Sequence, residues 1–313
     1  MILTLTPNAA LDRILFVDEI VPGTTMRCSG MVDHIGGKGL DASIALRMLG
    51  VETVGISFAA GATGQTVVRL VEGYGIQPEI IWLEGETRIA HVVVETKRNR
   101  HSHLIAGSLP VPAQGVAEFE GRTRAHLARA EWVIAGGSLA PGLPVDWYRR
   151  LADLAQDAGV PVLFDISGPP ALAVLSQPPA VLKMNWHEFE TTFGIHATSL
   201  AALAADALHV ARIHALPALV LTASEHGILA CTPEGVFHAH CPPQVVFNAA
   251  GAGDSASAAI AWRLALGESW RETLRWAAAV SAASVLTDRT AVLDTAEVER
   301  LLPLAIVRPL EID

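Results

Sequence analysis

A glycine-rich segment near the C-terminal end, Asn248–Ser255, places two glycines and an aspartate at the start of a predicted helix of small residues. Gly251 and Gly253 would let the backbone approach a bound anion closely. The N–H groups of Ala252 to Asp254 would point at that anion from the helix N-terminus. Asp254 could then accept a proton from an attacking hydroxyl group. Phosphoryl transfer needs this combination of an anion hole and a base.

Two other interpretations exist for this segment taken alone. It could be a plain glycine turn with an aspartate near a helix start. It also fits the dinucleotide-binding pattern G-x-G-x-x-A in a formal sense. That fold, however, requires a strand after the helix and an acidic residue at the end of that strand. A second helix over residues 270–286 is predicted to follow instead, which argues against dinucleotide binding.

A second glycine-rich segment, Gly36–Asp41, reads Gly-Gly-Lys-Gly-Leu-Asp and precedes a predicted helix over residues 40–49. Its glycines allow close backbone approach, and Lys38 supplies a positive charge for a phosphate or for polar hydroxyl groups. It is not a Walker loop, because Gly39 rather than Ser or Thr follows Lys38. On its own, the segment could equally be a surface turn.

A third segment, Lys183–Glu188, follows a predicted buried strand over residues 181–184 and opens a predicted helix over residues 187–193. Taken alone, Asn185 would be a helix cap. The pair His187-Glu188 is not a zinc-protease motif, because Thr191 stands where the second histidine would be.

The elements that position these segments follow an α/β pattern. From residue 116 onward, amphipathic helices alternate with apolar strands, which predicts a mostly parallel sheet covered on both faces. Two β-rich stretches, residues 12–34 and 88–106, alternate with period 2, and the second turns around Lys97–Arg100. They could pair into a small sheet that forms a lid over the carboxyl ends of the large sheet. We expect residues 1–313 to form a single α/β domain.

Composition restricts the possible partners. The chain has 313 residues, of which 51% are hydrophobic and 17% charged, as is typical of a well-packed globular protein. A net charge of −10 without a dense Lys/Arg block argues against nucleic acid and anionic membranes as partners. The longest apolar run, Trp276–Leu286, is shorter than the ~18 residues of a membrane span. The N-terminus lacks a basic leader and the three cysteines lack CxxC spacing, so we expect a cytoplasmic protein.

The order of these segments resembles the PfkB/ribokinase superfamily of carbohydrate kinases. Gly-Gly-Lys-Gly near the start and Ala249–Ser255 near the end carry the resemblance, with two matching blocks between them, Ile134–Pro144 and Leu182–Glu190. Thr4–Asp18 and the pair Thr87-Arg88 resemble the group of 1-phosphofructokinase, tagatose-6-phosphate kinase and the minor 6-phosphofructokinase. The resemblance covers essentially the whole chain. It implies a ribokinase-like three-layer sandwich, with a mostly parallel central sheet and a small β-sheet lid.

The resemblance also implies an activity, namely ATP-dependent phosphorylation of a sugar phosphate of the fructose 1-phosphate, fructose 6-phosphate or tagatose 6-phosphate class. Asp254 would be the catalytic base, and Gly251, Ala252 and Gly253 would form the anion hole. Glu188 would be linked to Mg²⁺ through water, and this one carboxylate suffices because Mg²⁺ keeps several waters. The implied ATP-binding residues are Lys183, Asn185, Thr222, Ser224, Gly227 and Gly253.

On the sugar side, the resemblance implies that Lys38 and Arg88 hold the phosphate already on the sugar. The other implied substrate-binding residues are Asp12, Gly37, Asp41 and Ser138. In relatives two lids clasp each other, which implies a homodimer. Apolar lid residues such as Ile14, Phe16, Val92 and Val94 fit this expectation, since exposed sheet edges of this kind are usually covered.

Three positions depart from the pattern of these relatives. Asp41 and Ala90 replace asparagines, which removes two amide contacts from the sugar side, and Ser224 stands where glycine is usual. Two alternatives therefore stay open: a kinase for an unphosphorylated sugar or nucleoside, and a non-catalytic sugar- or nucleotide-binding regulator. Retention of Asp254 and Glu188 argues against the regulator.

Overall fold

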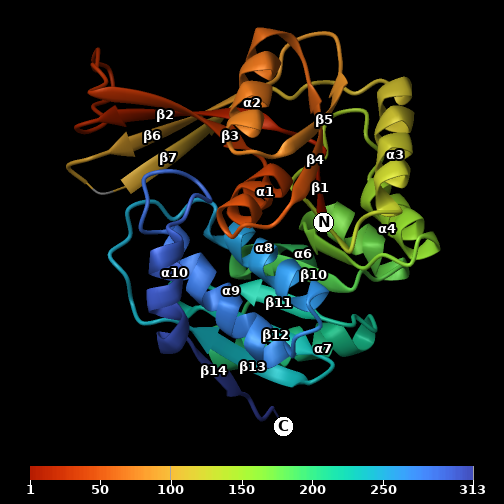
Figure 1. Cartoon of the computed structure of the whole chain (residues 1–313). Coiled ribbons are helices and arrows are strands. Elements are labelled where there is room, and N and C mark those ends of the chain that lie inside the picture. Colours follow the sequence, from red (N-terminus) through yellow and green to blue (C-terminus); the bar gives the residue numbers. More distant parts are fainter. Residues whose placement is uncertain (99, 313) are drawn as a thin grey trace.

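A ten-stranded sheet forms the centre of the protein, and a separate four-stranded sheet projects to one side (Figure 1). The computed structural model describes residues 1–98 and 100–312. The α/β class, the mostly parallel central sheet and the additional small sheet confirm the predicted fold class. Asn99, in the predicted turn of the small sheet, lies outside the described residues.

The large sheet has the order β14-β13-β12-β11-β10-β9-β8-β1-β4-β5. Neighbours from β5 to β11 are parallel, whereas β11 to β14 are antiparallel. The antiparallel strands β12 to β14 and the edge strand β5 were not predicted. The strands are β1 (Ile2–Thr6), β4 (Thr53–Ala59), β5 (Gln77–Trp82), β8 (Trp132–Gly136), β9 (Val162–Asp165), β10 (Val181–Asn185), β11 (Leu219–Thr222), β12 (Ile228–Thr232), β13 (Gly235–His240) and β14 (Ile306–Pro309).

Helices cover both faces of this sheet. Side chains of α1, α8, α9 and α10 share one buried apolar cluster with the sheet, and side chains of α3 to α7 share another on the opposite face. No helix in the described part of the chain is long and apolar enough to cross a membrane. The helices are α1 (Lys38–Met48), α2 (Gly61–Gly73), α3 (Ala113–Leu127), α4 (Trp147–Asp157), α5 (Gly168–Ala173), α6 (Trp186–Phe193), α7 (Leu200–Ile213), α8 (Ala252–Ala265), α9 (Trp270–Ser284) and α10 (Thr295–Leu301).

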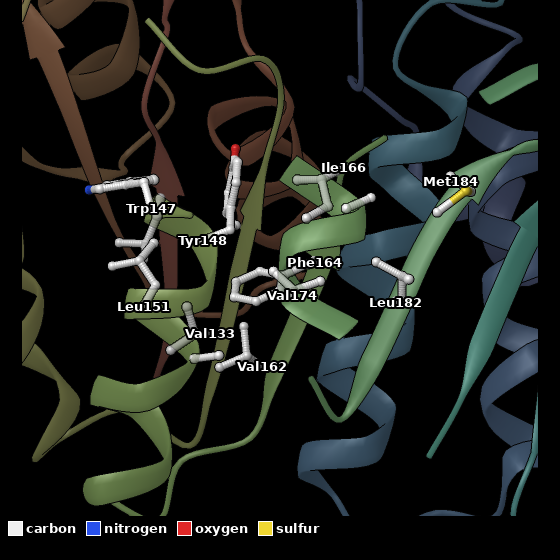
Figure 2. Close-up of a cluster of buried hydrophobic side chains, with 14 of the residues drawn as sticks. Val133, Trp147, Tyr148, Leu151, Val162, Phe164, Ile166, Val174, Leu182 and Met184 are labelled. Atoms are coloured by element: carbon white, nitrogen blue, oxygen red, sulfur yellow. The ribbon is translucent and has the colours of Figure 1, made fainter. Parts of the chain in front are cut away.

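The face covered by α3 to α7 contains an aromatic cluster, part of which Figure 2 shows. The rings of Trp147 and Tyr148 are 5.3 Å apart, and those of Tyr148 and Phe164 are 5.4 Å apart. Edge contacts of this kind are favourable between aromatic rings. The Tyr148 hydroxyl group donates a hydrogen bond of 2.8 Å to the carbonyl oxygen of Gly137, directly after β8. The core therefore fixes the loop that carries the predicted substrate residue Ser138.

The small sheet has the order β3-β2-β6-β7 and consists of β2 (Ala10–Val17), β3 (Gly30–Gly36), β6 (Ile89–Glu95) and β7 (Arg100–Ile105). Strands β2 and β6 are parallel and bring Asp12 opposite Ala90. Ile14 and Val92 are buried within the chain itself, so the expectation that these two residues are exposed was wrong. The action of this sheet as a lid remains a prediction.

Candidate active site

A cavity of about 540 Å³ opens where β9, β10 and β11 end and α8 begins. This position agrees with the rule that open α/β sheets bind ligands beyond the carboxyl ends of their strands. The cavity brings together sequence-predicted residues that lie far apart along the chain: Lys38, Lys183, Asn185, Glu188, Thr222, Ser224, Gly227, Ala252, Gly253 and Asp254. Gly251, predicted for the anion hole, does not line it, and neither do the predicted substrate-binding residues other than Lys38.

The N-terminus of α8 has free backbone donors that face this cavity. Gly251 caps the helix with a φ of 81°, a conformation that favours glycine. A Cβ atom on Gly251 would also collide with the backbone nitrogen of Ala291. The N–H groups of Gly253 and Asp254 have no backbone acceptor in the described ranges, whereas Ala252 N–H donates to Ala249 over 3.4 Å. Two donors are therefore available to an anion.

The pKa of the Asp254 carboxyl group lies near neutral pH. Burial raises the pKa of Asp254 to about 7, and the neighbouring Asp165 adds to this rise, although Lys38 and Lys183 oppose it. A general base works best when its pKa lies near the working pH. Asp254 can therefore hold or release a proton under ordinary conditions.

Asp165 did not stand out in the sequence, yet it is the centre of the charge network. One carboxylate oxygen, Oδ1, accepts a hydrogen bond of 2.7 Å from Lys38 Nζ. The other, Oδ2, accepts from Lys183 Nζ at 2.7 Å and from Ser257 Oγ at 3.0 Å. Burial alone would raise the pKa of Asp165, but the two lysines outweigh it and hold the pKa below its usual range. Its position as the last residue of β9, at the ligand-binding edge, is the signal that could have identified it.

Lys38 lies with the nucleotide-side residues. Its Nζ atom also donates to Glu188 Oε1 over 3.0 Å, so it bridges two carboxylates in the cavity wall. Burial alone would lower the pKa of Lys38, but the carboxylates of Asp165, Glu188 and Asp254 have the larger combined effect. The pKa of Lys38 is therefore raised, and its ammonium group stays charged. Lys38 therefore lies in the same cavity wall as the predicted ATP-binding residues, and its expected role at the phosphate of the sugar remains a prediction.

Asn185 and Glu188 form a capping box at the start of α6. Asn185 Oδ1 accepts from the N–H group of Glu188 at 2.8 Å, and Glu188 Oε2 accepts from the N–H group of Asn185 at 2.8 Å. The helix-cap interpretation of Asn185 is therefore confirmed. Glu188 Oε1 still faces Lys38 and the cavity, so the carboxylate also belongs to the site.

The loop after β11 keeps its turn in spite of the missing glycine. Ser224 adopts a φ of 50°, in the left-handed region that glycine favours. Gly227 follows with a φ of 85°, and a Cβ atom there would collide with the carbonyl oxygen of Ala239. Ser224 thus occupies the conformation of a glycine in the cavity wall.

Arg88 and Ser138, both predicted for the sugar side, are joined through a third residue. Arg88 Nη2 donates to the carbonyl oxygen of Asn8 at 2.8 Å, and Asn8 Nδ2 donates to Ser138 Oγ at 3.0 Å. Asn8 had not been singled out as a site residue. Burial raises the pKa of Asp12 to about 6, while Arg88 lowers it, which shows that these two side chains interact.

Gly37 has a φ of 128°, and a Cβ atom there would lie 2.6 Å from Thr6 Cγ2, so glycine is required. Asp41, four residues further on, is buried in the first turn of α1. Its Oδ1 atom has no hydrogen-bond partner in the described chain. Burial and the nearby Asp254 and Asp12 raise the pKa of Asp41 well above its ordinary value.

The chain is similar to known kinases over nearly its whole length. The family model for pfkB family carbohydrate kinases matches residues 8–296. The ATP-dependent 6-phosphofructokinase isozyme 2 of Mycobacterium tuberculosis is 30% identical over 307 residues, which are 97% of this chain and 89% of that protein. The 1-phosphofructokinase of Bacillus subtilis is 27% identical over 255 residues, which are 82% of either protein.

Solved structures agree with the fold. Phosphofructokinase-2 from Escherichia coli superimposes with a TM-score of 0.90 at 23% identity, over 96% of this chain and 98% of that one. A ribokinase from Arabidopsis thaliana superimposes with a TM-score of 0.78 at 19% identity, over 96% and 98% of the two chains.

Proposed function

Because the chain belongs to the pfkB family of carbohydrate kinases, we propose that it transfers the γ-phosphoryl group of ATP to a hydroxyl group of a sugar phosphate. As a carbohydrate kinase, it is a phosphotransferase with an alcohol group as acceptor. The proposed acceptor is fructose 1-phosphate, fructose 6-phosphate or tagatose 6-phosphate. The names of the two curated relatives support the fructose phosphates.

One observation carries this proposal: a carboxyl group with a pKa of about 7, free main-chain donors and two lysines meet in a single cavity. In the proposed reaction Asp254 takes the proton of the sugar hydroxyl group while the oxygen atom of that hydroxyl group attacks the γ-phosphorus. The bond between that phosphorus and the β–γ bridging oxygen breaks, and ADP leaves. The N–H groups of Gly253 and Asp254 face the moving charge, and Lys38 and Lys183 neutralise it.

The residues of the cavity fit a water-bound Mg²⁺. No group of three or more His, Cys, Asp or Glu residues is placed to hold a metal ion in the part of the chain described. Mg²⁺, however, keeps several waters and is typically held by one or two carboxylates together with substrate phosphates. Glu188 would hold it through water, beside the phosphates near Lys183 and Gly253. When bound, it would supply charge neutralisation for the phosphates.

An assay of ATP consumption with a panel of acceptors tests the proposed function. The panel contains the three sugar phosphates named above, ribose and nucleosides. We expect consumption only with a sugar phosphate, and a protein carrying Asp254→Asn gives the background rate. Consumption with ribose or a nucleoside alone would support the alternative acceptors. Consumption with none of them would support a non-catalytic regulator.

One observation favours the alternative function, in which the kinase acts on an unphosphorylated acceptor. Lys38 is engaged with Asp165 and Glu188, so Arg88 is the cation left among the predicted sugar-side residues. An anionic acceptor would be held more firmly by two cations than by one.

Replacing Arg88 by glutamine separates the two kinds of acceptor. If Arg88 binds the phosphate of the sugar, KM for the sugar phosphate should rise at least about 10-fold, because a charge-assisted hydrogen bond is lost. KM for ATP should stay unchanged. Arg122→Gln, on the surface of α3, is the matched control. An unchanged KM for the sugar phosphate would favour the unphosphorylated acceptor.

We also propose that a second copy of the chain covers the small sheet. The outer strands β3 and β7 expose large apolar side chains, with Met31 58%, Leu104 60% and Ile105 61% exposed. Apolar residues grouped on the strands of a small sheet indicate a contact surface. We expect sedimentation to show a dimer, and Leu104→Glu with Ile105→Glu to shift it to monomer. A wild-type protein that sediments only as monomer would contradict the homodimer.

A further inference from the structure

Three carboxyl groups follow one another from the small sheet to the cavity, and Asp41 in the middle is buried while Asp12 and Asp254 are partly exposed. Asp12 lies on β2, and a Cβ atom on the neighbouring Gly36 would collide with its carboxylate. Asp41 lies on the first turn of α1, and Asp254 on the first turn of α8, and these two helices pack against each other. Asp254 and Asp12 act on Asp41 as like charges, so ionisation of all three groups together is unfavourable and we expect one of them to hold a proton.

The positions of the cations indicate which of the three carboxyl groups holds the proton. Asp254 has Lys38 and Lys183 beside it, and both favour its ionised form. Asp12 has Arg88, which acts in the same way. The charged groups that act on Asp41 are the carboxylates Asp254 and Asp12, and they and burial outweigh a backbone hydrogen bond from Gly37, which lowers the pKa of Asp41. Its Oδ1 atom is buried without a partner in the described residues. An ionised carboxylate in this position would carry an uncompensated buried charge.

Other elements around Asp41 do not supply the missing cation. The strands β1, β4 and β8, which pack against α1, contain no charged side chain. Strand β3 carries Asp33, which pairs with Arg13, and His34, whose ring bonds to Ile35 and Tyr74. Burial lowers the pKa of His34, so its ring stays neutral. Arg289 interacts with Tyr74 and His34, and it is not among the groups that shift the pKa of Asp41.

We propose that Asp41 holds a proton when the acceptor binds, and that its carboxyl group donates this proton in a hydrogen bond to an oxygen atom of the sugar. The proposal rests on the proposed function, because it takes the space between Asp12 and Asp254 as the sugar site. A protonated carboxyl group has one donor and one acceptor oxygen, as a side-chain amide has. The proton also removes one negative charge from a site that must admit an anionic sugar phosphate. Asp41 is then a specificity-determining residue that selects a hydrogen-bond acceptor on the sugar.

Thermal unfolding at different pH values tests the protonation without any substrate. A carboxyl group whose pKa is raised in the folded state destabilises the protein as pH rises above its unfolded pKa, because only the unfolded chain ionises. Asp41→Asn removes this penalty. The variant should unfold at a higher midpoint temperature than the wild type. This difference in midpoint temperature should grow by at least ~2 °C between ~pH 5 and ~pH 8.

Asp157→Asn is the matched control, since Asp157 lies exposed at the end of α4. Its midpoint temperature should differ from that of the wild type by the same amount over the whole pH range. A difference for Asp41→Asn that stays constant, or that shrinks as pH rises, would show that Asp41 is ionised in the folded protein and would overturn the proposal. If Asp41→Asn does not fold, Asp41→Ser removes the same ionisable group with a smaller side chain and is measured in the same way.

The acceptor that the panel assay identifies tests the hydrogen bond. Asp41→Asn keeps a donor and an acceptor, so KM for the sugar should change less than about 3-fold, whereas Asp41→Leu should raise it at least about 10-fold. A comparable rise in both variants would mean that the ionised carboxylate binds the sugar. If no sugar is phosphorylated at all, the proposed function fails, while the unfolding measurement still decides the state of Asp41.

Discussion

Replacing Asp254 by asparagine is expected to lower kcat at least about 100-fold while leaving ATP binding nearly unchanged. The amide has nearly the shape of the carboxyl group but cannot take up the proton of the attacking hydroxyl group. The free N–H groups of Gly253 and residue 254, together with Lys38 and Lys183, would still bind the phosphates. Steady-state kinetics gives kcat, and calorimetric titration with ATP gives the affinity.

The pH dependence gives this prediction a second measurement. Since the pKa of Asp254 is about 7, kcat/KM of the wild type should fall as pH drops below about 7, where the base becomes protonated. The Asp254→Asn variant should lose this acidic limb. Unchanged turnover in Asp254→Asn would rule out the role of base.

Asp165→Asn is expected to have the largest effect on stability. Asp165 and Lys183 are both 2% exposed, and the change leaves Lys183 buried without its charge partner. Removing one partner of a buried ion pair lowers the free energy of unfolding by about 3–5 kcal/mol. We expect the free energy of unfolding, measured with urea, to fall by that amount. Activity should fall as well, because Lys38 and Lys183 lose the group that holds them toward the cavity.

Asp33→Asn is a matched control, because Asp33 accepts from Arg13 at the same distance of 2.7 Å but near the surface. Exposed pairs contribute about 0–1 kcal/mol. The loss in Asp165→Asn should also depend on pH. Because the pKa of Asp165 is lowered in the folded protein, its stabilisation is present above the ordinary value of 3.8 and disappears as pH falls below it. Equal losses in both variants would contradict the central role of Asp165.

The parts of the site that depend on neighbours in sequence could be predicted. Gly251, Gly253 and Asp254 lie within four residues, and the helix start that exposes their N–H groups is itself a local feature. The same is true of the alternation of buried strands and helices, which indicated the parallel part of the sheet. Asn185 and Glu188 were recognisable as a pair because the two members of a capping box lie only three positions apart in the sequence.

Contacts between distant segments could not be predicted in this way. Lys38 meets Asp165 and Glu188 across 127 and 150 residues, and nothing around Lys38 in the sequence marks these partners. The position of Asp165 at the end of a predicted strand was the one available signal, but an aspartate at a strand end is a common pattern and does not by itself reveal the two lysines that it binds. The hairpin of β12 and β13 and the pairing of β14 with β13 also depend on the sheet edge that β11 offers.

The two outer strands of the large sheet each contain a proline, Pro78 in β5 and Pro309 in β14. A proline has no N–H group to offer an additional strand, and such edges resist pairing with another chain. The outer strands of the small sheet, β3 and β7, contain none. Fibre-like stacking through the main sheet is therefore discouraged, and any β-mediated association of two molecules is directed to the small sheet.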